Sequence, residues 1–126
     1  MIAASSLATV GAVSVLALSA PVHVTVTAAT HTPKINARWN YTVKETAAGK
    51  PASGKITVQI VDPIGGVHAV EFGANSKDIT NIAFKGAFSD YMVFPATSRG
   101  VPLKIRFTLH SSSTTKVVNY VVTPGG

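Results

Sequence analysis

Apolar and polar residues alternate over most of the chain after residue 21, as they do in β-strands that bury one face. The clearest alternation lies in PLKIRFTLH (102–110). Its apolar positions are Leu103, Ile105, Phe107 and Leu109, and the positions between them are Lys104, Arg106, Thr108 and His110. This segment predicts a strand with one buried apolar face and one exposed face that is polar and basic.

Seven further segments show the same two-residue period. They are 22–27, 36–44, 55–62, 67–72, 79–84, 87–94 and 115–123. Clusters of Gly, Pro, Ser and Asn separate several of them, and these residue types favour turns; the clusters lie at 47–54, 75–78, 95–100 and 111–114. Short strands with turns at about ten-residue intervals predict an all-β fold of about seven strands, either a sandwich or a small barrel.

The stretch VDPIGGVHAVEFG (61–73) brings acids, glycines and a histidine close together, which raises the question of a binding loop. A phosphate-binding loop needs a lysine and a helix after its glycines, but strand-like residues follow Gly66. Asp62 and Pro63 suit the first two positions of a type I turn, and Gly65 or Gly66 can adopt the left-handed conformation that such hairpins need. The stretch therefore predicts a β-hairpin.

The beginning of the chain has a different character. Residues 1–33 contain no Lys, Arg, Asp or Glu, and residues 2–20 are small or apolar. We predict that residues 1–29 are an export signal or a membrane-anchoring segment, and that residues 30–126 form the sandwich. A signal normally begins with a basic residue, so a natural start upstream of Met1 is a third interpretation. Each of these places the domain in a secreted or cell-surface location.

Two sequence patterns carry a family resemblance. RWNYTVKETAAGKPASGKITVQIVD is similar to the strand–loop–strand opening of bacterial immunoglobulin-like and fibronectin-type-III-like modules of exported proteins, and PLKIRFTLHSSSTTKVVNYVV is similar to their final hairpin. The likeness covers most of residues 34–123, without the cysteine pair or the central-strand tryptophan that packs against it. The chain also resembles small exported proteins of high-GC Gram-positive (actinobacterial) bacteria. The resemblance implies an immunoglobulin-like β-sandwich of about seven antiparallel strands and no particular activity.

Composition narrows the class of protein. Only 13% of the residues are charged, and the absence of cysteine excludes disulfides, thiol catalysis and cysteine-based zinc sites. The net charge of +6 favours contact with anionic surfaces such as phosphate-bearing wall polymers. The basic residues are scattered singly rather than gathered into runs or arms, so we expect no specific nucleic-acid partner.

Four residues are candidates for binding. Lys104, Arg106 and His110 share the outward face of 102–110, and we expect this face to contact an anion. Clustering of Lys116 with Lys104 and Arg106 on one exposed face would support polyanion binding, and its absence would count strongly against it. Arg38 lies beside Trp39 and Tyr41, which would form a carbohydrate-binding platform if their rings were exposed. Most aromatic residues are expected in the core instead.

No motif indicates an enzyme, a metal site or a cofactor. The histidines His23, His31, His68 and His110 lie far apart in the sequence, the five acidic residues show no paired spacing, and there is no G-x-S-x-G elbow. His68 and Glu71 would face opposite sides of a strand. We therefore expect a module that acts by binding or adhesion. Its partner would be an envelope protein or a wall polymer, with membrane contact only through residues 2–20 if they are retained.

Overall fold

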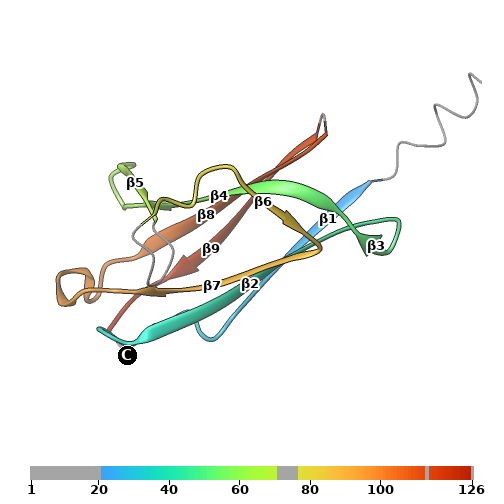
Figure 1. Ribbon diagram of the computed structural model, residues 1–126. Coiled ribbons are helices and arrows are strands. Elements are labelled where there is room, and N and C mark those ends of the chain that lie inside the picture. Colours follow the sequence, from blue (N-terminus) through green and yellow to red (C-terminus); the bar gives the residue numbers. More distant parts are fainter. Residues whose placement is uncertain (1–20, 71–76, 113, 126) are drawn as a thin grey trace, which may run out of the picture.

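The structure is a computed structural model, and it describes residues 21–70, 77–112 and 114–125. Nine strands make up most of this part (Figure 1). They are β1 (Val22–Ala28), β2 (Arg38–Ala47), β3 (Lys50–Pro51), β4 (Ser53–Val61), β5 (Val67–Ala69), β6 (Ile82–Lys85), β7 (Ala87–Val93), β8 (Leu103–Ser111) and β9 (Thr114–Val122). A short 3₁₀ turn, η1 (Ala96–Ser98), follows β7, and no helix of the described residues is long and apolar enough to cross a bilayer.

The strands form two antiparallel sheets. In the first sheet β2 lies between β1 on one side and β7 with the short β3 on the other. In the second sheet the order is β4, β8, β9, and β5 and β6 share the free side of β4. The predicted all-β sandwich is confirmed. β1 belongs to it, so the fold includes residues 22–28, which the sequence analysis placed with the leader.

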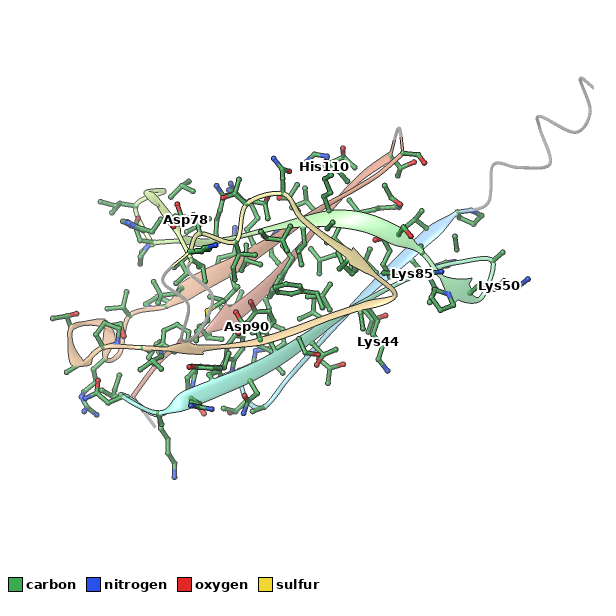
Figure 2. The ribbon with its side chains drawn as sticks, viewed as in Figure 1. Lys44, Lys50, Asp78, Lys85, Asp90 and His110 are labelled. Atoms are coloured by element: carbon green, nitrogen blue, oxygen red, sulfur yellow. The ribbon has the colours of Figure 1, made fainter. Side chains whose placement is uncertain are left out.

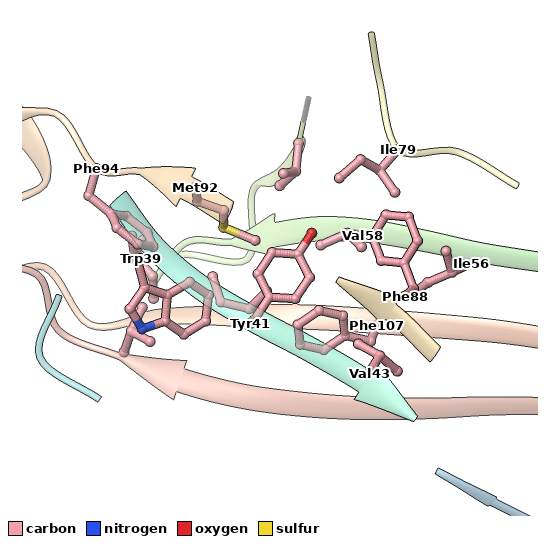
Figure 3. Close-up of a cluster of buried hydrophobic side chains, with 14 of the residues drawn as sticks. Trp39, Tyr41, Val43, Ile56, Val58, Ile79, Phe88, Met92, Phe94 and Phe107 are labelled. Atoms are coloured by element: carbon pink, nitrogen blue, oxygen red, sulfur yellow. The ribbon is translucent and has the colours of Figure 1, made fainter. Parts of the chain in front are cut away.

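The inner faces of the two sheets enclose one aromatic core (Figure 3). Trp39 is 2% exposed, its ring contacts those of Tyr41, Phe94 and Tyr120, and its Nε1–H donates to the carbonyl of Thr30 at 2.7 Å. Phe107 of β8 meets Tyr41 of β2 from the opposite sheet, with 5.4 Å between ring centroids. Such pairs contribute beyond the area that they bury, so they fix how the sheets face each other.

The chain passes from one sheet to the other at two neighbouring points. Ala52 joins β3 of the first sheet to β4 of the second, and Gly86 joins β6 of the second sheet to β7 of the first. The Gly86 N–H donates to the Ala52 carbonyl at 2.9 Å, and both residues also bond to the backbone of Glu45 on β2. We call this point, formed by Glu45, Ala52 and Gly86, the crossing corner.

The crossing corner explains one error of the sequence analysis. We predicted a turn over 47–54, but Lys50 and Pro51 pair with the end of β2 as β3 before the chain crosses at Ala52. A two-residue strand has no detectable period, and its pairing depends on the second crossing at Gly86. Sequence alternation carries no information about either.

Candidate functional site

The outer face of the second sheet carries the sequence-predicted residues Lys104, Arg106 and His110. Residues directly opposite each other on neighbouring strands project to the same side of a sheet. The register pairs Lys104 with Val61 of β4 and Val121 of β9, and it pairs Arg106 with Gln59 and Asn119. Further along the sheet, His110 pairs with Lys55 and Thr115. On β8 the outward residues alternate with the buried Leu103, Ile105, Phe107 and Leu109, so these residues and those opposite them on β4 and β9 point outward.

Five basic side chains lie on this face, which we call the basic face. They are Lys55, Lys85, Lys104, Arg106 and His110, and Figure 2 shows His110 on the outer side of β8. Lys104 and Arg106 are two residues apart on one strand, which places their Cα atoms about 7 Å apart. None of the outward-facing residues that the structure describes on β4, β5, β6, β8 and β9 is acidic.

Polar side chains fill the space between these cations. Gln59 and Asn119 flank Arg106, and Thr57 and Thr108 form the next row. The His110 ring approaches the Thr115 hydroxyl, with 3.0 Å between Nδ1 and Oγ1. An anion on this face would find charged and neutral hydrogen-bond donors side by side, which is the combination that holds phosphate and carboxylate groups.

Two expected members of the site lie elsewhere. Lys116 pairs with Leu109, so it projects from the opposite face of β9. The cluster of Lys104, Arg106 and Lys116 that would have supported polyanion binding is therefore absent, which counts against that interpretation. Arg38 belongs to β2 of the first sheet, where its guanidinium carbon lies 4.4 Å from the centre of the Tyr91 ring. Lys55 was not among the sequence-predicted residues, because only the pairing of β4 with β8 brings it beside His110.

The carbohydrate platform suggested for Trp39 and Tyr41 is excluded by burial. Each of these side chains is only 2% exposed, and their rings face the opposite sheet. Burial raises the pKa of the Tyr41 hydroxyl, and the negative charge of Asp90 adds to the shift. Figure 2 places Asp90 between the two sheets. These aromatic residues therefore form core rather than a sugar-binding surface.

The hairpin between β4 and β5 has the turn that the sequence predicts. The Gly65 N–H donates to the Asp62 carbonyl at 3.0 Å, and Gly65 adopts a φ of 88°. The Asp62 carboxylate accepts the N–H groups of Ile64 and Gly66 at 3.1 and 2.7 Å, and its second oxygen lies 2.8 Å from His68 Nε2. The bond to His68, followed by that to Gly66, holds the pKa of Asp62 below its usual range. The oxygens of the Asp62 carboxylate are bonded to groups of the same hairpin, so this stretch is a structural turn rather than a binding loop.

Glu45 is the residue whose environment the sequence analysis missed. It continues the inward series Trp39, Tyr41, Val43 on β2 and is 0% exposed, and neither carboxyl oxygen has a hydrogen-bond partner. Burial raises the pKa of its carboxyl group, and the nearby Ser111 hydroxyl opposes this shift. That hydroxyl donates its proton to the Ser53 carbonyl at 2.7 Å, so burial is the dominant influence.

The described residues contain no cluster of three or more His, Asp or Glu side chains that could hold a metal ion. His31 stacks on Tyr120 with 4.1 Å between ring centroids, and its Nδ1 lies 2.6 Å from the Val121 carbonyl. His68 and His110 have the partners given above. Glu71, which the sequence analysis compared with His68, lies outside the described residues.

No protein family model matches the chain, and no curated protein is similar to it in sequence. Among solved structures, the chain is similar to a DUF4466 family protein from Parabacteroides merdae ATCC 43184, with 11% sequence identity and a TM-score of 0.45. The similarity covers 82% of this chain and 43% of that protein, so the chain spans less than half of its length.

Proposed function

We propose that this protein is an exported or surface-attached module of the immunoglobulin-like or fibronectin-type-III-like kind that acts by binding rather than by catalysis. Its basic face binds an anionic polymer of the cell envelope. The observation that carries the proposal is the gathering of Lys55, Lys85, Lys104, Arg106 and His110 on one outer sheet face whose described strand residues include no acid.

The sheet order supports the immunoglobulin-like assignment. In such domains the first, second and fifth strands share one sheet, and the third, sixth and seventh share the other. Here β1, β2 and β7 form one sheet against β4, β8 and β9, which follows the same order once the short strands are set aside. β6 departs from the order of antibody constant domains, because it pairs with β4 instead of extending the first sheet.

The charge pattern supports a polyanion as the partner. Eleven Lys and Arg residues against five acids give a net charge of +6, which attracts anionic polymers from a distance. Of the five acids, Asp62 is paired with His68 and Glu45 is buried, so neither competes for the cations of the basic face. The uncharged, small and apolar residues 2–20, which we expect to belong to an export signal or anchor, support a location outside the cytoplasm.

The test is a binding titration of the full chain with long-chain inorganic polyphosphate and with polygalacturonate, with neutral dextran as the negative probe. We expect affinity for the two anionic polymers to fall steeply between about 50 and about 200 mM salt. The triple variant K55Q/K104Q/R106Q should lose at least about tenfold in affinity at the lower salt concentration and show a flatter salt dependence.

A matched control removes the same charge from elsewhere on the protein. Lys34, Lys44 and Lys50 are exposed and lie outside the second sheet, and Figure 2 shows Lys44 and Lys50 away from His110. If K34Q/K44Q/K50Q weakens binding as much as the basic-face triple, net charge alone is responsible and the assignment to this face is wrong.

A further inference from the structure

The crossing corner contains a buried carboxyl group on Glu45, the β2 residue whose backbone bonds to both crossing points. The Glu45 N–H donates to the Gly86 carbonyl at 2.9 Å, and the Glu45 carbonyl accepts the Ala52 N–H at 3.0 Å. The side chain of Glu45 is 0% exposed, and both of its oxygens lack a hydrogen-bond partner. Glu45, whose backbone joins β2 to both crossing points, therefore also carries an ionisable side chain that water does not reach.

Gly54 of β4 makes the room for this carboxyl group. A Cβ atom at position 54 would lie 2.6 Å from Glu45 Oε1 and 2.9 Å from the His110 carbonyl oxygen. Both distances are shorter than van der Waals contact allows. The carboxyl group thus occupies the space that any side chain at position 54 would fill, so its burial is built into the packing of β2 against β4 and β8.

The surroundings offer no compensating charge. Glu45 makes no ion pair within the described part of the chain. The other titratable side chains at inner strand positions are Tyr41 on β2, Lys50 on β3, His68 on β5, Asp90 on β7, and Lys116 and Tyr120 on β9. Lys50, His68 and Lys116 are exposed, and the influences on the Glu45 carboxyl are burial and the Ser111 hydroxyl. Lys44, Lys55, Lys85 and His110 lie on neighbouring strands but face outward.

We propose that Glu45 is a neutral carboxylic acid in the folded domain, and that loss of its proton loosens the crossing corner. An ionised carboxylate without a partner is far more costly to bury than the neutral acid. Ionisation therefore favours states in which β2 separates from Ala52, Gly54 or Gly86 and water reaches the carboxylate. This makes the corner a device that responds to pH, and it does not depend on the proposed binding function.

The direction of the response follows from proton linkage. The folded state raises the pKa of Glu45 above its ordinary value, so the folded state binds this proton more tightly than the unfolded state. The resulting stabilisation is complete below the ordinary glutamate pKa, and it is lost as the pH rises through the higher pKa of the folded state. The corner is therefore most stable in acid and weakens toward alkaline pH.

The chain offers a direct measurement, because Glu45 and Glu71 are its only glutamates. In the full chain labelled with ¹³C at the glutamate carboxyl carbons, NMR would show two signals, assigned by the variant E71Q. We expect the Glu45 signal to titrate above the ordinary glutamate range, with a loss of amide protection at Gly86 and Ala52, relative to intrinsic exchange at each pH, over the same interval. If the Glu45 signal titrates in the ordinary range, the proposal is overturned.

Stability measurements give a second, independent test. The unfolding equilibrium constant of the wild type should rise severalfold between about pH 5 and about pH 9 through this group. E45Q and E45M, which cannot ionise, should lack that rise, whereas the matched control E71Q should keep it. A rise in E45Q or E45M equal to that of the wild type contradicts the proposal. The wild-type titration decides the question if both variants fail to fold.

Discussion

At the scale of single residues, Gly54 determines what Glu45 can do. The φ angle of Gly54 lies outside the left-handed region, so the obstacle to a larger residue is space rather than backbone conformation. We expect Gly54→Ala to destabilise the domain by about 1–3 kcal/mol, because the new Cβ would overlap the Glu45 carboxyl group and the His110 carbonyl. Urea unfolding followed through the fluorescence of Trp39, the only tryptophan, measures this difference.

A double-mutant cycle identifies the cause of that loss. In the Glu45→Ala background the overlap with the carboxyl group disappears, so Gly54→Ala should cost less than it does in the wild type. Gly65→Ala is the control, since its Cβ would meet nothing within 4 Å and its cost comes from the φ of 88° alone. If Gly54→Ala lowers the free energy of unfolding equally in both backgrounds, the new Cβ atom does not overlap the Glu45 carboxyl group.

Alternation was a good guide to which residues are buried but a poor guide to their chemistry. It predicts the inward positions of Trp39, Tyr41 and Val43, and all three are buried. Two positions after Val43 comes Glu45, which looks like the polar end of a strand, yet β2 continues to Ala47 and the packing of β4 encloses it. Glu45 can be buried because Gly54 on β4 has no side chain, and alternation along β2 carries no information about the residue at position 54.

At the scale of elements, the β4–β5 hairpin depends on Asp62. Its carboxylate bonds to Ile64, Gly66 and His68, and these bonds keep the pKa of Asp62 below its ordinary value. The resulting stabilisation is present above the ordinary aspartate pKa and is lost as the pH falls through the lower pKa of the folded state. We expect Asp62→Ala to increase amide exchange at Gly66 at neutral pH.

The matched variant is Asp78→Ala, which removes the same charge from an exposed position outside the hairpin. It should leave Gly66 exchange unchanged, and wild-type exchange at Gly66 should approach that of Asp62→Ala only in strong acid. If exchange at Gly66 is the same in Asp62→Ala and in the wild type at neutral pH, the backbone turn holds the hairpin without its side chain.

Strand existence was predictable here, whereas strand pairing was not. The alternation in 102–110 identifies β8 and its outward basic residues Lys104, Arg106 and His110. It cannot show that Lys55 lies opposite His110 or that Lys116 lies opposite Leu109, because both depend on the register between strands. The basic face was thus only partly predictable, since a face that spans several strands is fixed by pairing as well as by period.

At the scale of the whole molecule, the outer edge of β9 is unpaired around Val117 within the described part of the chain. The Thr123 N–H and the Val121 carbonyl point away from β8 and bond to His31. Because this direction repeats every two residues, the backbone groups of Val117 also point outward, and no described strand pairs with them. Val117 is 54% exposed, and an apolar open edge favours pairing between copies.

We expect Val117→Lys to reduce aggregation of concentrated protein on heating, as measured by light scattering, with little change in the free energy of unfolding. Thr108→Lys is the matched control, because Thr57, Thr108 and Val117 lie in one row of the same face, and Thr108 is on the central strand whereas Val117 is at the edge. An equal reduction in both variants would assign the effect to added charge rather than to a blocked edge.

The two terminal strands also decide how the domain responds to tension. Residue 21 lies near the crossing corner, whereas Gly125 lies beside Pro33 and Gly100 at the other end of the long axis (Figure 1). A force between these two residues acts along β1 and β9. It must therefore shear their hydrogen-bond ladders against β2 and β8 all at once, rather than peel them open one bond at a time. The same strand arrangement that builds the sandwich thus suits it to carry load between two attachment points.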